Sequence, residues 1–300
     1  MRAIHRLQFE TRPSAWSIYP QLVRWGKPAI LAAGEDVPHI EALLPKVHVS
    51  LAHFEAYNRI CGVRDSSYLP IAYPHMLAAP LHLSILATRA FPVRALGLVH
   101  VANQIVQHRV VRPDEPGDLR VWVAGHRVTE RGQEFDFHSE LRVSDAIVWE
   151  ETSAYLARRR SRSVAARDAA LRGQRANSDS LDPDGPSKSV SFRVPANIGR
   201  RYARISGDFN PIHLSKFTAK PFGFGRAIAH GMWTLARCAA ELERELLSAP
   251  CELSVTFKLP ILLPAWVLLQ HWRRDDGFGL SLRDAHAARA HLVGRLRRLG

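Results

Sequence analysis

The chain has 300 residues, of which 46% are hydrophobic, so it can form one large or two medium globular domains. Its 41 basic and 28 acidic residues give a formal net charge of +13, and its three scattered cysteines form no CxxC pair. This cysteine usage argues against a disulfide scaffold and a cysteine zinc site. The first twenty residues lack the apolar core of a secretory signal, and the apolar stretch at 259–269 is short and contains two prolines. We therefore expect a cytoplasmic protein with no membrane partner.

The hydrophobic pattern of the first half of the chain predicts an extension followed by one α+β unit. Residues 1–45 show no clear pattern and are interpreted as an N-terminal extension with some strand or helix. A helix is expected after His75, because Leu77, Leu81 and Ile85 fall on one helical face. Strands are expected at 98–111, 119–128, 135–143 and 147–155. One helix followed by antiparallel strands indicates an α+β unit, which we assign to residues 46–160.

The middle of the chain predicts a linker at residues 161–189, which are rich in Arg, Ser, Asp, Pro and Gly. Seven arginines lie between positions 158 and 175, and three more lie between 295 and 298. This charge is typical of a solvated linker, but it could also bind nucleic acid or attract anionic groups such as CoA phosphates. We favour the solvated linker and expect no nucleic-acid partner.

The second half, residues 190–300, repeats the same order of elements. Its helix is expected to begin at Gly231, and its apolar face is formed by Met232, Leu235, Ala239, Leu242 and Leu246. Alternating residues then indicate strands at 255–257, 266–272, 278–282 and 290–296. The layout is again a helix packed on one face of an antiparallel sheet.

A diverged internal repeat relates the two halves. Tyr57-Asn-Arg-Ile-Cys-Gly62 is similar to Tyr202-Ala-Arg-Ile-Ser-Gly207, and the paired positions are 145 residues apart. Each segment is followed by a histidine-containing stretch at the start of a helical pattern, Tyr73-Pro-His-Met-Leu77 and Ala229-His-Gly-Met-Trp233. Two matches in the same order indicate duplication, and duplication implies two copies of one fold.

The segment most informative about chemistry is 202–213, Tyr-Ala-Arg-Ile-Ser-Gly-Asp-Phe-Asn-Pro-Ile-His. Its glycine and proline predict a helix that ends near Ile205 and a sharp turn after it. Across such a turn Asp208 and His213 can converge, and a carboxylate beside an imidazole fixes the ring and shifts both pKa values. Asn210 can anchor the turn through its side chain. The same residues are also good turn formers, so a purely structural pair remains an alternative.

The string Ser206-Gly-Asp-Phe-Asn-Pro-Ile-His213, with Tyr202 before it and Ala229-His-Gly-Met232 after it, resembles the signature of the MaoC-like dehydratases. These are also called (R)-specific enoyl-CoA hydratases. The resemblance covers residues 190–298, and the first half resembles the family only through the repeat. It implies an α+β double hot-dog fold with two units, each a long helix packed on a curved antiparallel sheet. It further implies a hydro-lyase that acts on trans-2-enoyl or (R)-3-hydroxyacyl thioesters of CoA or acyl-carrier protein.

The resemblance also implies roles for individual residues. Asp208 and His213 match the catalytic pair that activates a water, and Asn210 matches the residue that supports their loop. At the 145-residue offset Val63 and Tyr68 stand at the positions of the pair. The first unit is therefore expected to be non-catalytic and to widen the tunnel for an acyl chain.

Gly231 matches the position whose backbone N–H receives the thioester oxygen, and a helix N-terminus is physically suited to that charge. His230 and Ser206 are further substrate-binding candidates. From the residues alone, Gly231 could equally be a simple helix start and His230 a buried or capping histidine. The resemblance implies no cofactor, and it is compatible with a homodimer of double hot-dog protomers.

Two other functions remain open at this stage. Hot-dog folds also host acyl-CoA thioesterases, because a fold does not fix a function. A non-catalytic module that binds acyl groups or nucleic acid is the second alternative. His75, His82 and His100 have no metal-ligand spacing, so we expect no metal site.

Overall fold

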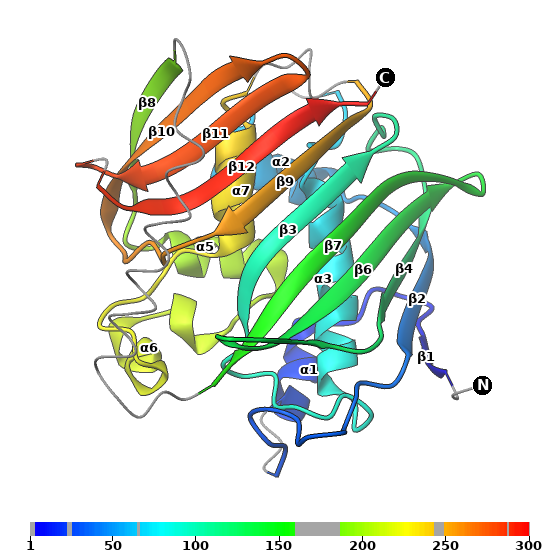
Figure 1. Cartoon of the computed structure of the whole chain (residues 1–300). Helices are drawn as coiled ribbons and strands as arrows, with labels where there is room; N and C mark the ends of the chain where they lie inside the picture. Colours follow the sequence, from blue (N-terminus) through cyan, green and yellow to red (C-terminus); the bar gives the residue numbers. More distant parts are fainter. Residues whose placement is uncertain are drawn as a thin grey trace.

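A computed structural model describes residues 4–22, 26–64, 67–159, 187–242, 249–286 and 288–299. Its strands form a single sheet in the order β1-β2-β4-β6-β7-β3-β9-β12-β11-β10-β8, and β5 pairs with β6. The sheet curves around two central helices, α3 and α7, each covered by the strands of its own half (Figure 1). This arrangement confirms the predicted α+β double hot-dog.

The described residues of the first unit include the helices α1 (Ala15–Leu22), α2 (Leu51–Cys61) and α3 (Tyr73–Ala87). Its strands are β1 (His5–Gln8), β2 (Ile40–Val47), β3 (Val99–Gln107), β4 (Gly117–Val123), β5 (Arg127–Thr129), β6 (Gly132–Val143) and β7 (Ala146–Arg158). Nearly every residue of α3 is buried, including its histidines. A helix that is apolar all round belongs in a core, and this one is enclosed by the sheet.

The second unit begins with β8 (Ser187–Val194) and α5 (Ile198–Ser206). Short turns of helix follow at η2 (Pro211–His213), α6 (Lys216–Ala219) and η3 (Lys220–Phe222), before the central helix α7 (Gly231–Ala239). The remaining strands are β9 (Cys251–Phe257), β10 (Ala265–Arg274), β11 (Gly277–Asp284) and β12 (Ala290–Arg298). Antiparallel pairing of β3 with β9 joins the two units into one sheet.

The repeat seen in the sequence is visible in the backbone. Helix α2 ends at Gly62 with φ 72°, and α5 ends at Gly207 with φ 76°. Both glycines adopt the left-handed conformation that closes a helix at little steric cost. Tyr57 and Tyr202 are both almost fully buried, and the two helices pack against each other. The predicted helix end near Ile205 is therefore confirmed.

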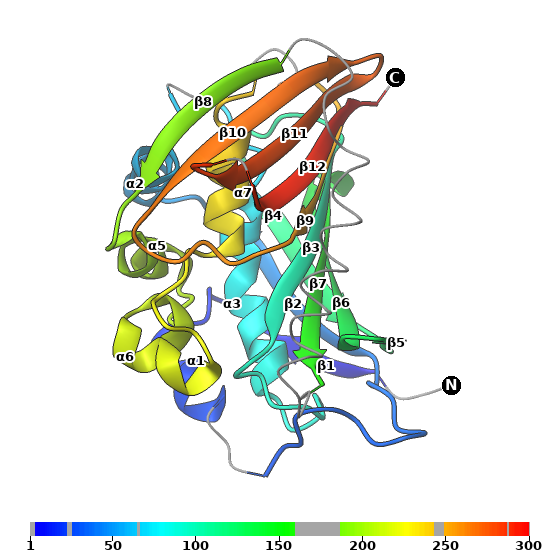
Figure 2. The same cartoon turned by 60° about the vertical axis from the view of Figure 1, so that its left-hand side comes forward.

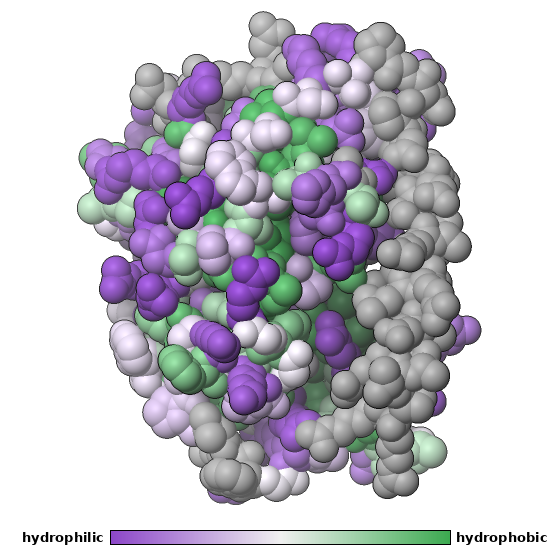
Figure 3. Space-filling model, turned by 90° about the vertical axis from the view of Figure 1, so that its left-hand side faces the viewer, coloured by the Kyte–Doolittle hydropathy of each residue, from purple (hydrophilic) through white to green (hydrophobic). Residues whose placement is uncertain are grey.

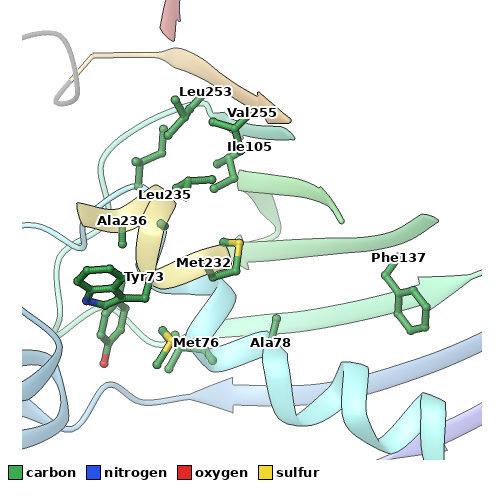
Figure 4. Close-up of a cluster of buried hydrophobic side chains, with 14 of the residues drawn as sticks. Tyr73, Met76, Ala78, Ile105, Phe137, Met232, Leu235, Ala236, Leu253 and Val255 are labelled. Carbon is green, nitrogen blue, oxygen red and sulfur yellow. The ribbon is translucent and has the colours of Figure 1, made fainter. Parts of the chain in front are cut away.

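Hydrophobic side chains from both units share one core between the two central helices. Figure 4 shows Met76 of α3 facing the region of α7 that carries Met232 and Leu235, with Ile105 and Leu253 contributed by the paired strands β3 and β9. All five side chains are at most 5% exposed. Because the two halves bury apolar surface against each other, the hydrophobic effect stabilises them as one body.

Several element boundaries differ from the sequence prediction. Helix α7 ends at Ala239, although the apolar face was expected to continue through Leu246; Leu242 still packs in the core, and residues 243–248 lie outside the described chain. Helix α3 begins at Tyr73 rather than after His75, because a proline is well accommodated in the first turn of a helix. The strand expected at 119–128 is divided between β4 and β5.

Three strands lie outside the ranges that were individually predicted as strands. Strand β1 and most of β2 lie within the predicted extension 1–45, so that part of this segment belongs to the sheet. Strand β8 begins at Ser187, inside the predicted linker, whose residues 161–186 lie outside the described chain. Among the helices of the described ranges, none is long and apolar enough to cross a membrane.

Candidate active site

The turn after α5 carries the predicted catalytic pair. The Asp208 N–H donates to the Ser206 hydroxyl oxygen at 3.1 Å, and the Asn210 side chain accepts from the Ile212 N–H at 3.4 Å as the N-cap of η2. These bonds are the turn chemistry that Ser and Asn side chains provide. Figure 2 shows α5 beside the lower end of α7, with α6 and α1 grouped below it. Ser206 and Asn210 therefore contribute to the site by shaping the loop.

Asp208 and His213 converge without bonding directly. The distance from Asp208 Oδ2 to His213 Nε2 is 3.9 Å, which is too long for a hydrogen bond but suits two groups that share one water. The Asp208 side chain is 38% exposed, whereas that of His213 is 9% exposed. The carboxylate can therefore be reached from outside while the imidazole is held inside the protein.

Hydrogen bonding assigns the tautomer of His213. Its Nδ1 lies 2.8 Å from the carbonyl oxygen of Ile228, so Nδ1 carries the proton and donates it to that acceptor. In the neutral ring Nε2 is then an unprotonated acceptor that points toward Asp208. The pair thus offers a water two acceptors, one carboxylate oxygen and one imidazole nitrogen.

The two oxygens of the Asp208 carboxylate have different environments. Oδ1 accepts from the Asn210 N–H at 3.1 Å and from the Tyr19 hydroxyl at 3.1 Å. Oδ2 faces His213 and lies 3.7 Å from His230 Nε2, beyond hydrogen-bond distance, and no described residue donates to it. One oxygen is therefore fixed, and the other retains its lone pairs for a ligand.

His230 packs directly on the imidazole of His213. The rings of His213 and His230 are stacked with centroids 3.6 Å apart, and His230 Nε2 donates to the backbone oxygen of Asp208 at 3.0 Å. Its Nδ1 is buried and finds no hydrogen-bond partner in the described part of the chain. Burial, together with the neighbouring His213, lowers the pKa of His230 to about 3. His230 is therefore a neutral support for the loop.

The pKa shifts of Asp208 and His213 leave both side chains able to accept a proton at neutral pH. Burial raises the pKa of Asp208, but His230, His213 and the hydrogen bonds from Asn210 and Tyr19 together outweigh it, and the net pKa is lowered. Burial lowers the pKa of His213, although the nearby carboxylate and the bond to Ile228 partly oppose it. At neutral pH the site therefore combines an ionised carboxylate with an uncharged imidazole.

Gly231 is the first residue of α7 and directly follows His230. The first N–H groups of a helix have no partner within the helix, and the helix dipole favours negative charge there. A Cβ at this position would meet ring atoms of Phe257 at 3.2 Å, tighter than ordinary contact. Glycine therefore keeps the amide accessible beside an aromatic ring, as a backbone donor to a ligand oxygen requires.

A second polar cluster is enclosed within the first unit, between α3 and the strands β3, β6 and β7. Glu151 accepts from His75 Nδ1 at 2.9 Å and from Asn103 Nδ2 at 2.7 Å, while His82 Nε2 lies 2.8 Å from the Ser139 hydroxyl. Burial favours the uncharged form of Glu151, but its histidine and amide partners outweigh this effect and hold its pKa at about 2. This network ties the central helix to the sheet.

The donor atoms of His75, His82 and Glu151 lie within 4.8 Å of one another, as do those of the group formed by Asp208, His213 and His230. The sequence did not indicate the first group, because its members come from a helix and a distant strand. In each of these four histidines one ring nitrogen already hydrogen-bonds a protein oxygen, whereas His213 Nε2 remains an open acceptor. The expectation of no metal site stays a prediction.

The described residues of the first unit hold no copy of the predicted catalytic pair. Val63 follows the left-handed Gly62 where Asp208 follows its own glycine, and Tyr68 is 42% exposed at the surface. A valine and an exposed phenol cannot together bind and deprotonate a water, which supports a non-catalytic first unit.

The C-terminal arginines are largely paired. Arg295 forms an ion pair with Asp276, and Arg297 forms one with Glu252 at 2.7 Å. Charges neutralised in this way contribute little to an electrostatic surface for nucleic acid. The arginines at 160–175 lie outside the described residues.

A family model and a curated relative both match this chain. The family model of the MaoC-like domain matches residues 184–279. The chain is 31% identical over 266 residues to 3-hydroxyacyl-thioester dehydratase X of Mycobacterium tuberculosis, a match covering 88% of this chain and 91% of that protein. The chain belongs to the MaoC-like dehydratase family.

Solved structures agree with this assignment. A crystal structure of HtdX from M. tuberculosis superposes with a TM-score of 0.73 at 28% identity, covering 86% of this MaoC-like chain and all of that one. A MaoC-like dehydratase from Phytophthora capsici gives a TM-score of 0.67 at 14% identity, over 88% of this chain and 95% of that one. The second likeness concerns the fold alone.

One residue of this MaoC-like site was missed by sequence reasoning. Tyr19, in the segment interpreted as an extension, bonds to a carboxylate 189 positions away. No motif surrounds it, and its helix is short, so nothing local indicates a role. The structure brings it to the same loop as the predicted Asp208, His213 and His230.

Proposed function

We propose that this MaoC-like protein is a hydro-lyase that adds water to trans-2-enoyl thioesters and, in reverse, dehydrates (R)-3-hydroxyacyl thioesters. The observation that carries the proposal is the 3.9 Å gap between Asp208 Oδ2 and His213 Nε2, two free acceptors beside the N-terminus of α7. The relative named 3-hydroxyacyl-thioester dehydratase supports the substrate class.

The reaction follows from these acceptors. A water in the gap donates one hydrogen to Oδ2 and the other to Nε2, which directs a lone pair toward C3 of the enoyl group. As the C3–O bond forms, one acceptor takes a proton from the water, and that same proton is then delivered to C2, so that H and OH add across the double bond. We favour Asp208 as the base, although the two groups titrate as a coupled pair.

Charge that develops on the thioester oxygen is stabilised by the N–H of Gly231. The amide lies at a helix N-terminus, where the dipole favours an enolate, and removal of one such donor typically costs about 3 kcal/mol of barrier. His230 maintains the loop geometry next to it. The hydration is redox-neutral, so the proposal requires no redox cofactor.

The substrate is proposed to be the thioester of CoA or of an acyl-carrier protein. On the side of the molecule that lies at left in Figure 1, hydrophobic residues are visible in a band bordered by hydrophilic ones (Figure 3). An apolar band on the side of the molecule where α5 and α6 lie fits an acyl chain attached to a polar carrier.

The test is a spectrophotometric assay of the purified protein with a chain-length series of trans-2-enoyl-CoA. We expect loss of the absorbance of the conjugated enoyl thioester and formation of the (R)-3-hydroxyacyl product, with no release of free thiol. Thiol release without hydration would instead establish a thioesterase, and retention on DNA with steep salt dependence and no turnover would favour a binding module.

A further inference from the structure

Helix α1 of the N-terminal segment packs directly on the catalytic loop. The Trp16 ring lies 4.7 Å from the ring of Phe209, the residue after Asp208, and Tyr19 meets the same ring edge-on at 6.2 Å. A Cβ on Gly207 would come within 3.1 Å of the Ala15 Cβ. The loop that holds the carboxylate is therefore enclosed by a segment far away in the sequence.

The Tyr19 hydroxyl determines which carboxylate oxygen remains available. It donates to Asp208 Oδ1 at 3.1 Å, and the same oxygen accepts from the Asn210 N–H. Two donors on one oxygen fix the rotation of the carboxylate about its last side-chain bond. Oδ2 is thereby held toward His213, at the distance that a shared water requires.

We propose that Tyr19 is a positioning residue of the hydration reaction, which orients Asp208 by occupying Oδ1 so that Oδ2 alone meets the water. The inference rests on the proposed function for its chemistry. It makes α1 part of the active site, although every residue of the family motif lies in the other unit.

Titratable groups face Asp208 from several elements. His213 and His230 belong to its own unit, Tyr202 lies on α5, and His100 and Tyr155 reach it electrostatically from β3 and β7. None of these other groups donates a hydrogen bond to the carboxylate, and burial together with the carboxylate keeps the pKa of Tyr19 raised, so its proton stays in place. Removal of that donor alone is therefore expected to raise the pKa of Asp208.

The decisive variant is Tyr19→Phe, which removes one oxygen and keeps the ring against Phe209. The matched control is Gln21→Ala, at an exposed position of the same helix. We expect Tyr19→Phe to lower kcat about tenfold or more, as loss of a hydrogen bond to a charged group does, with little change in KM. The acid limb of kcat/KM against pH should move to higher pH, whereas Gln21→Ala should match the parent.

A parent-like kcat and acid limb in Tyr19→Phe, or an equal loss in Gln21→Ala, would overturn the inference. NMR titration of the Asp208 carboxyl carbon gives a readout that does not depend on turnover, and its midpoint should rise in Tyr19→Phe. An unchanged midpoint refutes the role of Tyr19. Absence of hydration by the parent protein would instead refute the proposed function, so the two failures are distinguishable.

Discussion

The role of the Gly231 amide can be tested by removing one hydrogen-bond donor from the backbone. Proline has no N–H but is well tolerated at the first position of a helix, which Gly231 occupies. The preceding residue must be extended, and His230 has φ −67° and ψ 139°, as a residue before proline requires. Gly231→Pro is therefore expected to leave α7 intact while deleting the proposed oxyanion donor.

Comparison of kcat between Gly231→Pro and Gly231→Ala separates the loss of the N–H donor from the crowding of the Phe257 ring. Any Cβ at this position approaches the Phe257 ring to 3.2 Å, so Gly231→Ala introduces the same contact and keeps the N–H. Loss of one oxyanion donor costs about 3 kcal/mol, which corresponds to roughly 10²-fold in kcat. We expect Gly231→Pro to be about 10²-fold slower than Gly231→Ala, which in turn should be close to the parent once the ring has shifted.

The assay is steady-state hydration of one enoyl-CoA at saturation, with thermal unfolding measured for both variants. Comparable melting temperatures ensure that the rates compare folded proteins. If Gly231→Pro and Gly231→Ala differ by less than a few-fold in kcat, the amide does not stabilise the enolate, and the oxyanion assignment fails.

Further variants test the pair, the repeat and the buried cluster. Asp208→Asn should lower turnover by about 10²-fold or more, in line with loss of a general base, with little effect on thermal unfolding; parent-like activity would remove the assignment. Val63→Asp in the Asp208→Asn background should restore nothing, because Tyr68 still stands where a histidine is required, and any gain in the same assay would contradict the non-catalytic first unit. Burial, with the nearby His75, lowers the pKa of His82 in the folded protein to about 3. In the unfolded chain this histidine gains a proton as the pH drops below about 6.5. The contribution of His82 to the free energy of unfolding should therefore fall by about 1.4 kcal/mol per pH unit below that pH. Urea unfolding of His82→Gln should show a shallower acid loss than the parent, and an equal slope would count against a buried neutral imidazole.

Local patterns made the centre of the fold predictable. Alternation predicted the strands that have one face in the core, and Gly207 and Pro211 marked the turn because these residue types favour a turn wherever they occur. The predicted start of α7 at Gly231 is confirmed, and it too was indicated by a local pattern. The first three residues of β8 were assigned to the linker because they are exposed and polar, as a strand that pairs only with β10 at the edge of the sheet can be.

The candidate site was predictable only in its local part. Asp208, His213 and Asn210 lie within one turn, so a short motif could indicate them. Tyr19 reaches the same carboxylate from the opposite end of the chain, and Glu151 meets His75 across 76 positions. Such contacts depend on how the units pack, which one sequence does not encode in any local spacing.

The two histidine–carboxylate pairs of this chain show why proximity alone does not identify a catalytic site. His75 and Glu151 are hydrogen-bonded at 2.9 Å, a closer approach than the 3.9 Å between Asp208 and His213. The Glu151 side chain, however, is fully buried, and its oxygens are occupied by protein donors. Breaking such a buried pair is costly, so it serves stability and offers no acceptor to a ligand. Asp208 keeps one oxygen unoccupied and is 38% exposed. The more widely spaced pair, Asp208 and His213, can therefore admit a water and take its proton. Substitution of Glu151 should lower stability, whereas substitution of Asp208 should lower turnover.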